Sequence, residues 1–203
     1  SRDMSPHPFR ILINLSYDGR DFYGWQKQPK LAPTVQGLLE EQLGKIFNQP
    51  IRIIGSGRTD RGAHALSQWA HADVPTDPTP LKLKRRLNQM TPASLRVNAV
   101  YLAPGNFHAQ RSSIKKKYVY RLYHAEWPSP FQLHYAHHLS KPVDVAILNK
   151  LSRLLVGTQD FKSFQNTGTD VETSVRTVFK AYWTQKGRFY IFNRGGDGFL
   201  RQM

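Results

Sequence analysis

The 203-residue sequence contains no cysteine, no long apolar run and few acidic residues. Without thiols, the chain can form neither a disulfide framework nor a thiolate metal site. No apolar run approaches the ~20 residues that a membrane-spanning helix needs. Residues 1–8 are polar and lack the apolar centre of a secretory signal peptide. We therefore expect a soluble, cytoplasmic protein with no membrane partner.

The sequence has an excess of positively charged residues. It contains 29 lysines and arginines against 14 aspartates and glutamates, which gives a formal net charge of +15 at pH 7. Such an excess is typical of proteins that bind nucleic acids. Part of it is clustered, at Lys82, Lys84, Arg85 and Arg86 and again at residues 115–117. The first cluster is compatible with phosphate contacts and also with a solvated helix face.

The hydrophobic pattern of the first half predicts alternating strands and helices. Apolar residues alternate in the first strand, and they recur at helical spacing after Thr34, a favourable N-cap. The predicted elements are, in order, strand 10–17, helix 34–47, strands 51–54 and 66–74, helix 83–90 and strand 95–102. The order β-α-β-β-α-β is that of a split βαβ, or ferredoxin-like, unit.

The second half begins the same order again and stops before completing it. Its predicted elements are strand 115–124, a long loop at 127–138, helix 147–157, a hairpin of strands 175–184 and 188–194, and a helix starting after Gly198. We divide the chain into a flexible N-terminus (1–9), an N-terminal ferredoxin-like half (10–104) and a C-terminal half (105–203). We expect the C-terminal half to lack the last helix and strand of its unit.

One loop combines glycines, arginines and a carboxylate. Residues 55–65 read Gly-Ser-Gly-Arg-Thr-Asp-Arg-Gly-Ala-His-Ala and directly follow an apolar run. Glycines allow close backbone approach and positive φ angles. Arg58 and Arg61 favour the ionised form of Asp60 and present donors for phosphate. The loop therefore places an anion in a cationic setting, which suits attack on, or deprotonation of, a group carried by a polyanion.

This loop resembles the signature of the tRNA pseudouridine synthase A (TruA) family. Further motifs of the family follow in the same order, from about residue 10 to the last residue. They are Tyr-Asp-Gly at 17–19, Phe-Tyr-Gly-Trp-Gln at 22–26, Thr-Val-Gln-Gly at 34–37, Phe-His-Ala at 107–109, Lys-Tyr-Val-Tyr at 117–120, Asp-Phe-Lys-Ser-Phe at 160–164, Val-Arg-Thr at 175–177 and Gly-Phe-Leu-Arg at 198–201. The joint order makes the resemblance specific.

The resemblance implies an α+β fold of two ferredoxin-like halves, with a joined central antiparallel sheet and a cleft. It also implies a homodimer that binds tRNA across both subunits. Members of the family continue with Val-Arg, a helix and a strand where this sequence ends at Met203. The arginine of that pair is the one that the family places beside its catalytic aspartate, and Arg201 is not that residue.

The resemblance further implies a tRNA pseudouridine synthase, which isomerises uridine to pseudouridine in the anticodon stem-loop, at nucleotides 38, 39 and 40. Asp60 would be the catalytic nucleophile or base, and no cofactor or metal would be needed. Arg58 would act in base flipping or backbone contact, because a stacked base must leave the helix before it can react. Tyr118 would stack on the target uracil.

Two other functions stay open on the residues alone. One is a basic RNA-binding protein without catalysis, or a catalytically impaired fragment of the synthase. The other is a metal-dependent nuclease that uses Asp60, His71 and Asp73, since carboxylate and imidazole groups bind metals. The sheet-bound aromatic pattern of the common RNA-binding modules is absent, and a passive binder has no need of the Asp60 loop.

Overall fold

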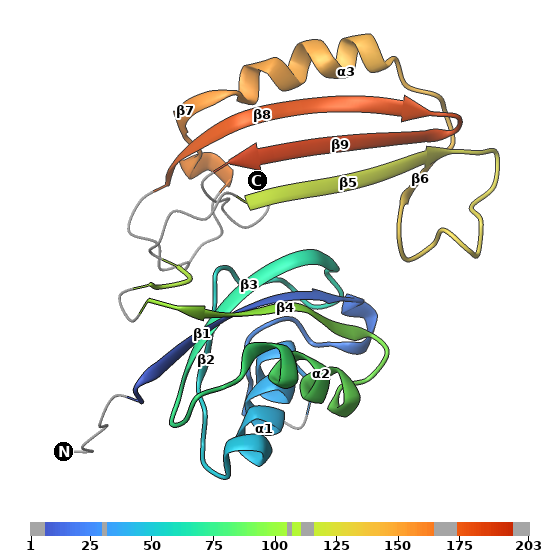
Figure 1. The fold of residues 1–203 in the computed structure, drawn as a ribbon. Coiled ribbons are helices and arrows are strands. Elements are labelled where there is room, and N and C mark those ends of the chain that lie inside the picture. Colours follow the sequence, from blue (N-terminus) through green and yellow to red (C-terminus); the bar gives the residue numbers. More distant parts are fainter. Residues whose placement is uncertain (1–6, 30–31, 105–106, 111–115, 165–173, 197–203) are drawn as a thin grey trace. The chain divides into compact units, whose positions relative to one another are not determined.

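The computed structural model describes residues 7–29, 32–104, 107–110, 116–164 and 174–196. Its contacts divide the chain into two compact units, Ser1–Ile114 and Lys115–Met203. Each unit has a sheet of its own and at least one α-helix (Figure 1). The chain is thus α+β, as predicted. The predicted ranges 1–9, 10–104 and 105–203 and the joining of the two sheets remain predictions.

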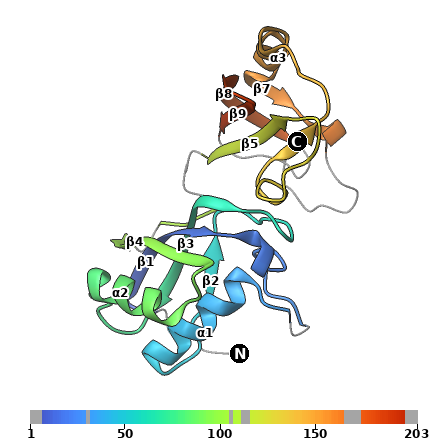
Figure 2. The same cartoon turned by 90° about the vertical axis from the view of Figure 1, so that its right-hand side faces the viewer.

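The first unit contains an antiparallel four-stranded sheet, in the order β2-β3-β1-β4. Its elements are β1 (Phe9–Tyr17), the 3-10 helix η1 (Gly19–Asp21), α1 (Val35–Phe47), β2 (Ile53–Gly55), β3 (Ala65–Val74), α2 (Pro80–Met90) and β4 (Leu95–Ala103). Both α-helices lie on the same face of the sheet (Figures 1 and 2). All strands and helices predicted for residues 10–102 are confirmed.

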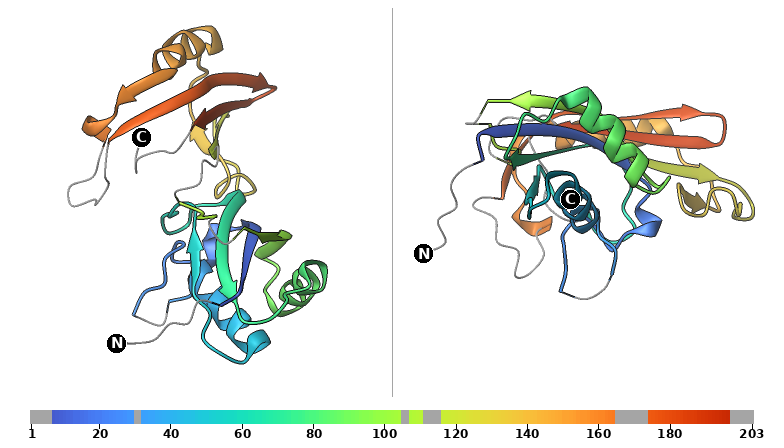
Figure 3. Two further views of the ribbon diagram at one scale, coloured as in Figure 1. Left: turned by 60° about the vertical axis from the view of Figure 1, so that its left-hand side comes forward. Right: turned by 60° about the horizontal axis from the view of Figure 1, so that its bottom comes forward.

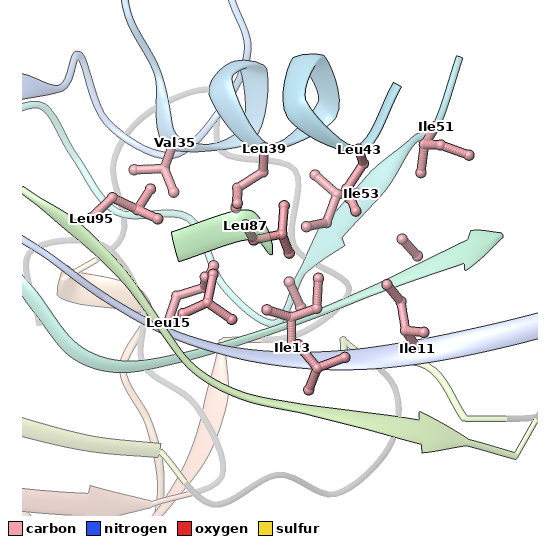
Figure 4. Packing of buried hydrophobic residues seen from close by; sticks show 14 of the residues in the cluster. Ile11, Ile13, Leu15, Val35, Leu39, Leu43, Ile51, Ile53, Leu87 and Leu95 are labelled. Carbon is pink, nitrogen blue, oxygen red and sulfur yellow. The ribbon is translucent and has the colours of Figure 1, made fainter. Parts of the chain in front are cut away.

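The core of the first unit lies between the sheet and the two helices. Alternation along β1 points Ile11, Ile13 and Leu15 toward the helices, where all three are fully buried. Leu39 of α1 and Leu87 of α2 meet them from the other side (Figure 4). Helix α1 begins where the sequence predicted, because the Thr34 side chain accepts a hydrogen bond from the Gly37 amide at 3.1 Å.

The second unit contains a mixed five-stranded sheet, in the order β6-β5-β9-β8-β7. Its elements are β5 (Lys116–His124), β6 (His137–Leu139), α3 (Val145–Ser152), the 3-10 helix η2 (Arg153–Leu155), β7 (Gly157–Asp160), the 3-10 helix η3 (Lys162–Phe164), β8 (Val175–Lys186) and β9 (Phe189–Gly196). β5 and β6 pair in parallel, and the pairs β5–β9, β9–β8 and β8–β7 are antiparallel. Helix α3 packs against β8 (Figures 1 and 3).

The second unit departs from the predictions at β6, at the end of α3 and at β7 (Gly157–Asp160), for which no strand was predicted. The last two residues of the predicted loop 127–138 belong to a strand, because β6 begins at His137. The α-helix ends at Ser152 rather than near Gly157 and continues only as a short 3-10 turn. Its apolar side chains Ile147 and Leu151 are 57% and 56% exposed. Helical spacing identifies an apolar stripe but does not show what covers it. The helix predicted after Gly198 lies outside the described residues.

Within the described part of the chain, every helix is too short or too polar to cross a lipid bilayer.

Candidate active site

The Asp60 loop joins two neighbouring strands, β2 and β3. Its first residues are held at the sheet, since the Ser56 amide donates to the Trp69 carbonyl at 2.8 Å. The Gln68 side chain donates to the Gly57 carbonyl at 2.6 Å. Both bonds extend the pairing of the strands into the loop, so the chain that leads to Arg58 has a fixed direction.

The middle of the loop rests on residues 17–25, which begin with the last residue of β1. The Tyr17 hydroxyl lies 2.8 Å from the Thr59 hydroxyl. The Trp25 amide donates to the Thr59 carbonyl at 3.1 Å. The residue directly before Asp60 is therefore bound through both its side chain and its backbone. The aromatic anchors Tyr17 and Trp25 are only 5% and 3% exposed, so the contacts to Thr59 rest on the core of the unit.

Two glycines of the same segment lie too close to the loop to carry a side chain. A β-carbon at Gly19 would lie 2.1 Å from the Ala63 carbonyl oxygen. A β-carbon at Gly24 would lie 2.7 Å from the Thr59 carbonyl oxygen, and Gly24 also has a φ of +80°. Both positions require glycine because backbone meets backbone there. The segment thus forms a cradle for the Asp60 loop.

His64 joins the end of the loop to the same cradle. Its Nδ1 accepts a hydrogen bond from the Gly19 amide at 3.0 Å and lies 3.3 Å from the Asp18 carboxylate. Asp18 is also paired with Arg20 at 2.6 Å. These contacts give His64 a structural use in holding the two segments together.

Arg58, Asp60 and Arg61 are exposed on this supported loop. The Ala63 amide donates to the Asp60 carbonyl at 3.0 Å, which closes a turn. The guanidinium of Arg61 lies 4.2 Å from the centre of the Tyr23 ring, a cation–π distance. A carboxylate between two arginines on a supported backbone can attack or deprotonate a group on an anionic ligand.

Tyr118 belongs to the second unit, in β5. It lies opposite Arg194 of the neighbouring strand β9, and the guanidinium is 5.7 Å from the centre of the tyrosine ring. Arg194 is 9% exposed, whereas Tyr118 is 44% exposed. Burial raises the pKa of the Tyr118 hydroxyl, and the nearby charge of Arg194 offsets part of that rise. Burial lowers the pKa of Arg194.

The structure thus brings Arg58 and Asp60 together on one loop and places Tyr118 in the other unit. Their meeting in one site remains a prediction. Arg194 was missed in the sequence because a single arginine in a strand carries no motif. The alternation of β9 and its pairing with β5 place Arg194 beside Tyr118, and pairing register is not readable from one strand alone.

His71 and Asp73 of β3 have other partners than a metal ion. The His71 Nδ1 accepts a hydrogen bond from the Ala109 amide at 3.0 Å. Asp73 forms an ion pair with Arg10 at 2.7 Å, and Arg10 also donates to the Phe107 carbonyl. Among the described residues, no His, Asp and Glu side chains form a group of three suited to a metal. These contacts weigh against the nuclease hypothesis.

Known proteins similar to this chain point to one family. A family model described as tRNA pseudouridine synthase matches residues 14–110 and 151–203. The tRNA pseudouridine synthase A of Maridesulfovibrio salexigens is 41% identical over 197 residues, which is 96% of this chain and 72% of the relative. That of Methylacidiphilum infernorum is 40% identical over 192 residues, 94% of this chain and 75% of the relative. That of Bdellovibrio bacteriovorus is 39% identical over 199 residues, 96% of this chain and 76% of the relative.

Replacing Gly24 by alanine should destabilise the protein far more than the same change at Gly62. Both glycines have a positive φ, of +80° and +77°, but only Gly24 has backbone within reach of a new β-carbon. We expect Gly62→Ala to reduce the free energy of unfolding by about 1 kcal/mol through backbone strain alone. Gly24→Ala adds the clash with Thr59 and should cost about 2–4 kcal/mol. Urea unfolding measures both, and equal losses would disprove the close packing of the cradle.

Acid should weaken the fold through His71. Burial, and next the charge of Arg10, lower the pKa of His71 from 6.5 to about 4. The unfolded chain therefore binds more protons between these two values, and stability rises with pH across that window. The contribution is complete above pH 6.5 and is lost as the pH falls to about 4; we expect about 1–3 kcal/mol. His71→Asn keeps an acceptor for Ala109 without the titration. Urea unfolding of this variant should depend less on pH between these values, and an unchanged dependence would contradict the assignment.

Proposed function

The chain belongs to the tRNA pseudouridine synthase family, and on that basis we propose that it isomerises uridine to pseudouridine in tRNA. Its targets are nucleotides 38, 39 and 40 of the anticodon stem-loop. The observation that carries the proposal is the cradled loop, which presents Asp60 between Arg58 and Arg61. A protein that only binds RNA has no need to fix one carboxylate among cations.

Asp60 is the proposed catalytic residue. Its ionised carboxylate either attacks C1′ of the ribose or removes the proton from C2′. In both routes the bond between N1 and C1′ breaks and the electron pair leaves with the uracil. The uracil then turns and C5 bonds to C1′. In the first route the bond between C1′ and the carboxylate breaks and its electron pair returns to Asp60, and in the second route Asp60 gives the proton back to C2′. C5 then loses its proton and N1 takes one up. Atoms and electrons balance without an oxidant, a metal or a nucleotide, so no cofactor is invoked.

Arg58 is the proposed RNA-binding residue of the loop. It precedes Asp60 by two positions on a backbone that is held through Thr59. A cation fixed at that place can bind a phosphate or occupy the space that a flipped base leaves. Its position beside the carboxylate links base flipping to the arrival of the sugar at Asp60.

Tyr118 is proposed to stack on the target uracil, and Arg194 to position its ring. The guanidinium lies 5.7 Å from the ring centre, so it can hold the aromatic plane through a cation–π contact. Arg194 is nearly buried, which limits its own movement, while 44% of Tyr118 is exposed and available to a base.

The finer architecture is part of the proposal. The element order and the strand order β2-β3-β1-β4 of the first unit support a ferredoxin-like half. We propose that the second unit is a related half, that the two sheets join around a cleft, and that the protein acts in the cytoplasm as a homodimer without a bound metal.

Release of tritium from uracil C5 tests the reaction and the role of Asp60 together. Bonding C5 to C1′ must expel the C5 hydrogen, so a C5-labelled tRNA transcript should lose its label while the RNA stays intact. Asp60→Asn should lower the rate at least about 1000-fold without weakening tRNA binding, because the loop backbone is unchanged. Glu41→Gln, at an exposed carboxylate of α1 outside the cradle and the loop, is the control and should react normally. Turnover by Asp60→Asn would refute its role, and cleaved RNA would favour a nuclease.

Substitutions at Tyr118 and Arg194 separate stacking from positioning. Stacking of a base on an aromatic ring is worth about 1–3 kcal/mol, so Tyr118→Leu should lower kcat/KM about 5- to 150-fold while Tyr118→Phe stays near normal.

Arg194→Met should lower kcat about tenfold with little change in KM and little loss of fold stability, because an apolar side chain replaces a buried cation. Arg194→Lys should recover part of kcat. If Tyr118→Phe and Tyr118→Leu behave alike, stacking is not the function, and if Arg194→Met reacts normally, Arg194 does not position the ring.

A further inference from the structure

Helix α2 carries a face of unmatched positive charge. Lys82, Arg85 and Arg86 are exposed and stand three and four positions apart, so they form one stripe along the helix. Lys84 adds a partly buried fourth charge, and the helix contains no acidic residue. In the part of the chain that the structure describes, none of these four side chains takes part in an ion pair. We name Lys82, Arg85 and Arg86 the α2 stripe.

The stripe destabilises the helix that bears it. Like charges at spacings of three and four residues repel each other by about 0.2–0.5 kcal/mol per pair. Lys82 also lies in the first turn, where the helix dipole disfavours a cation. At the N-terminus of α2 the side chain of Thr79 makes no capping hydrogen bond, whereas Thr34 caps the N-terminus of α1 and Asp144 that of α3. On α1, by contrast, Lys45 is paired with Glu41 at 2.7 Å.

The rest of the helix holds the stripe rigidly in place. Leu83 and Leu87 on the opposite face are 3% and 0% exposed and belong to the core. The Asn88 side chain forms hydrogen bonds with both the amide and the carbonyl of Val97 in β4, at 2.8 and 2.9 Å. The three charges therefore keep a fixed spacing, about 1.5 Å of axial rise per residue.

The charges of the stripe weaken α2, and yet the core holds them in a fixed arrangement. Departures from local rules of stability concentrate at functional sites, so this arrangement favours a function in binding. We propose that the α2 stripe is a second tRNA-binding surface, which contacts phosphates of the substrate and contributes to affinity rather than to turnover. A polyanion supplies the missing negative charge along the whole stripe at once. The identity of the RNA rests on the proposed function, whereas the contact with its phosphates does not.

The triple variant Lys82→Ala, Arg85→Ala and Arg86→Ala tests the stripe. Its affinity for a tRNA transcript is measured at several salt concentrations, beside Lys141→Ala, Lys150→Ala and Arg153→Ala, which removes the same charge from exposed residues of the second unit. Each lost phosphate contact reduces the slope of log affinity against log salt by roughly 0.7–0.9. We expect a slope smaller by about 2–3, an affinity at least about tenfold weaker, and a much smaller effect in the control.

The remaining readouts separate a binding surface from a structural effect. The unfolding midpoint of the stripe variant should stay the same or rise, because alanine is the best helix former and the repulsion is gone. In the tritium assay KM should rise while kcat at saturating tRNA stays unchanged. If the stripe variant binds tRNA with the affinity and salt slope of the wild-type protein, the stripe is only a solvated face and the proposal is wrong. If the stripe variant and the control variant lose the same affinity, net charge alone explains the loss and the proposal is also wrong. If the chain made no pseudouridine, the binding experiment would still decide the question.

Discussion

The close approach of two backbone segments, at Gly19 against Ala63 and at Gly24 against Thr59, is the constraint on which the Asp60 loop depends. A loop between strands is normally the most mobile part of a sheet protein. Here an aromatic segment anchored by Tyr17 and Trp25 replaces solvent on one side of the loop. The backbone is therefore fixed while the side chain of Asp60 stays exposed, and that combination suits a group that must meet a large substrate.

The sheet connects the cradle and the Asp60 loop to the core of the first unit. Tyr17 is the last residue of β1, whose apolar side chains Ile13 and Leu15 are fully buried against the helices. β1 is central, with β3 on one side and β4 on the other, and β3 begins where the Asp60 loop ends. Strand pairing therefore fixes the cradle and the loop relative to each other. A site built between neighbouring strand ends gains precision from the pairing itself.

The sequence predicted the features that depend on neighbouring residues in the chain, and it missed those that depend on how strands pair. Alternation in β1 and the cap at Thr34 are read from residues that lie next to each other, so the elements of the first unit could be predicted. The short strands β6 and β7 were missed, since their existence depends on a partner strand rather than on their own pattern. For the same reason Arg194 could not be placed beside Tyr118, and the burial that lowers the pKa of His71 could not be foreseen.

The placement of the acidic residues explains how a chain with so few of them can both fold and bind a polyanion. Several aspartates serve the fold, in the ion pair of Asp73 with Arg10 and in the cap that Asp144 gives to α3. Asp18 joins Arg20 and His64 near the cradle. Asp73 and Asp18 thus neutralise Arg10 and Arg20, and Asp144 serves a helix end, while the surplus of positive charge stays. A carboxylate repels an approaching phosphate unless nearby cations outweigh it. Arg58 and Arg61 do so locally for Asp60, and the net charge of +15 does so at longer range.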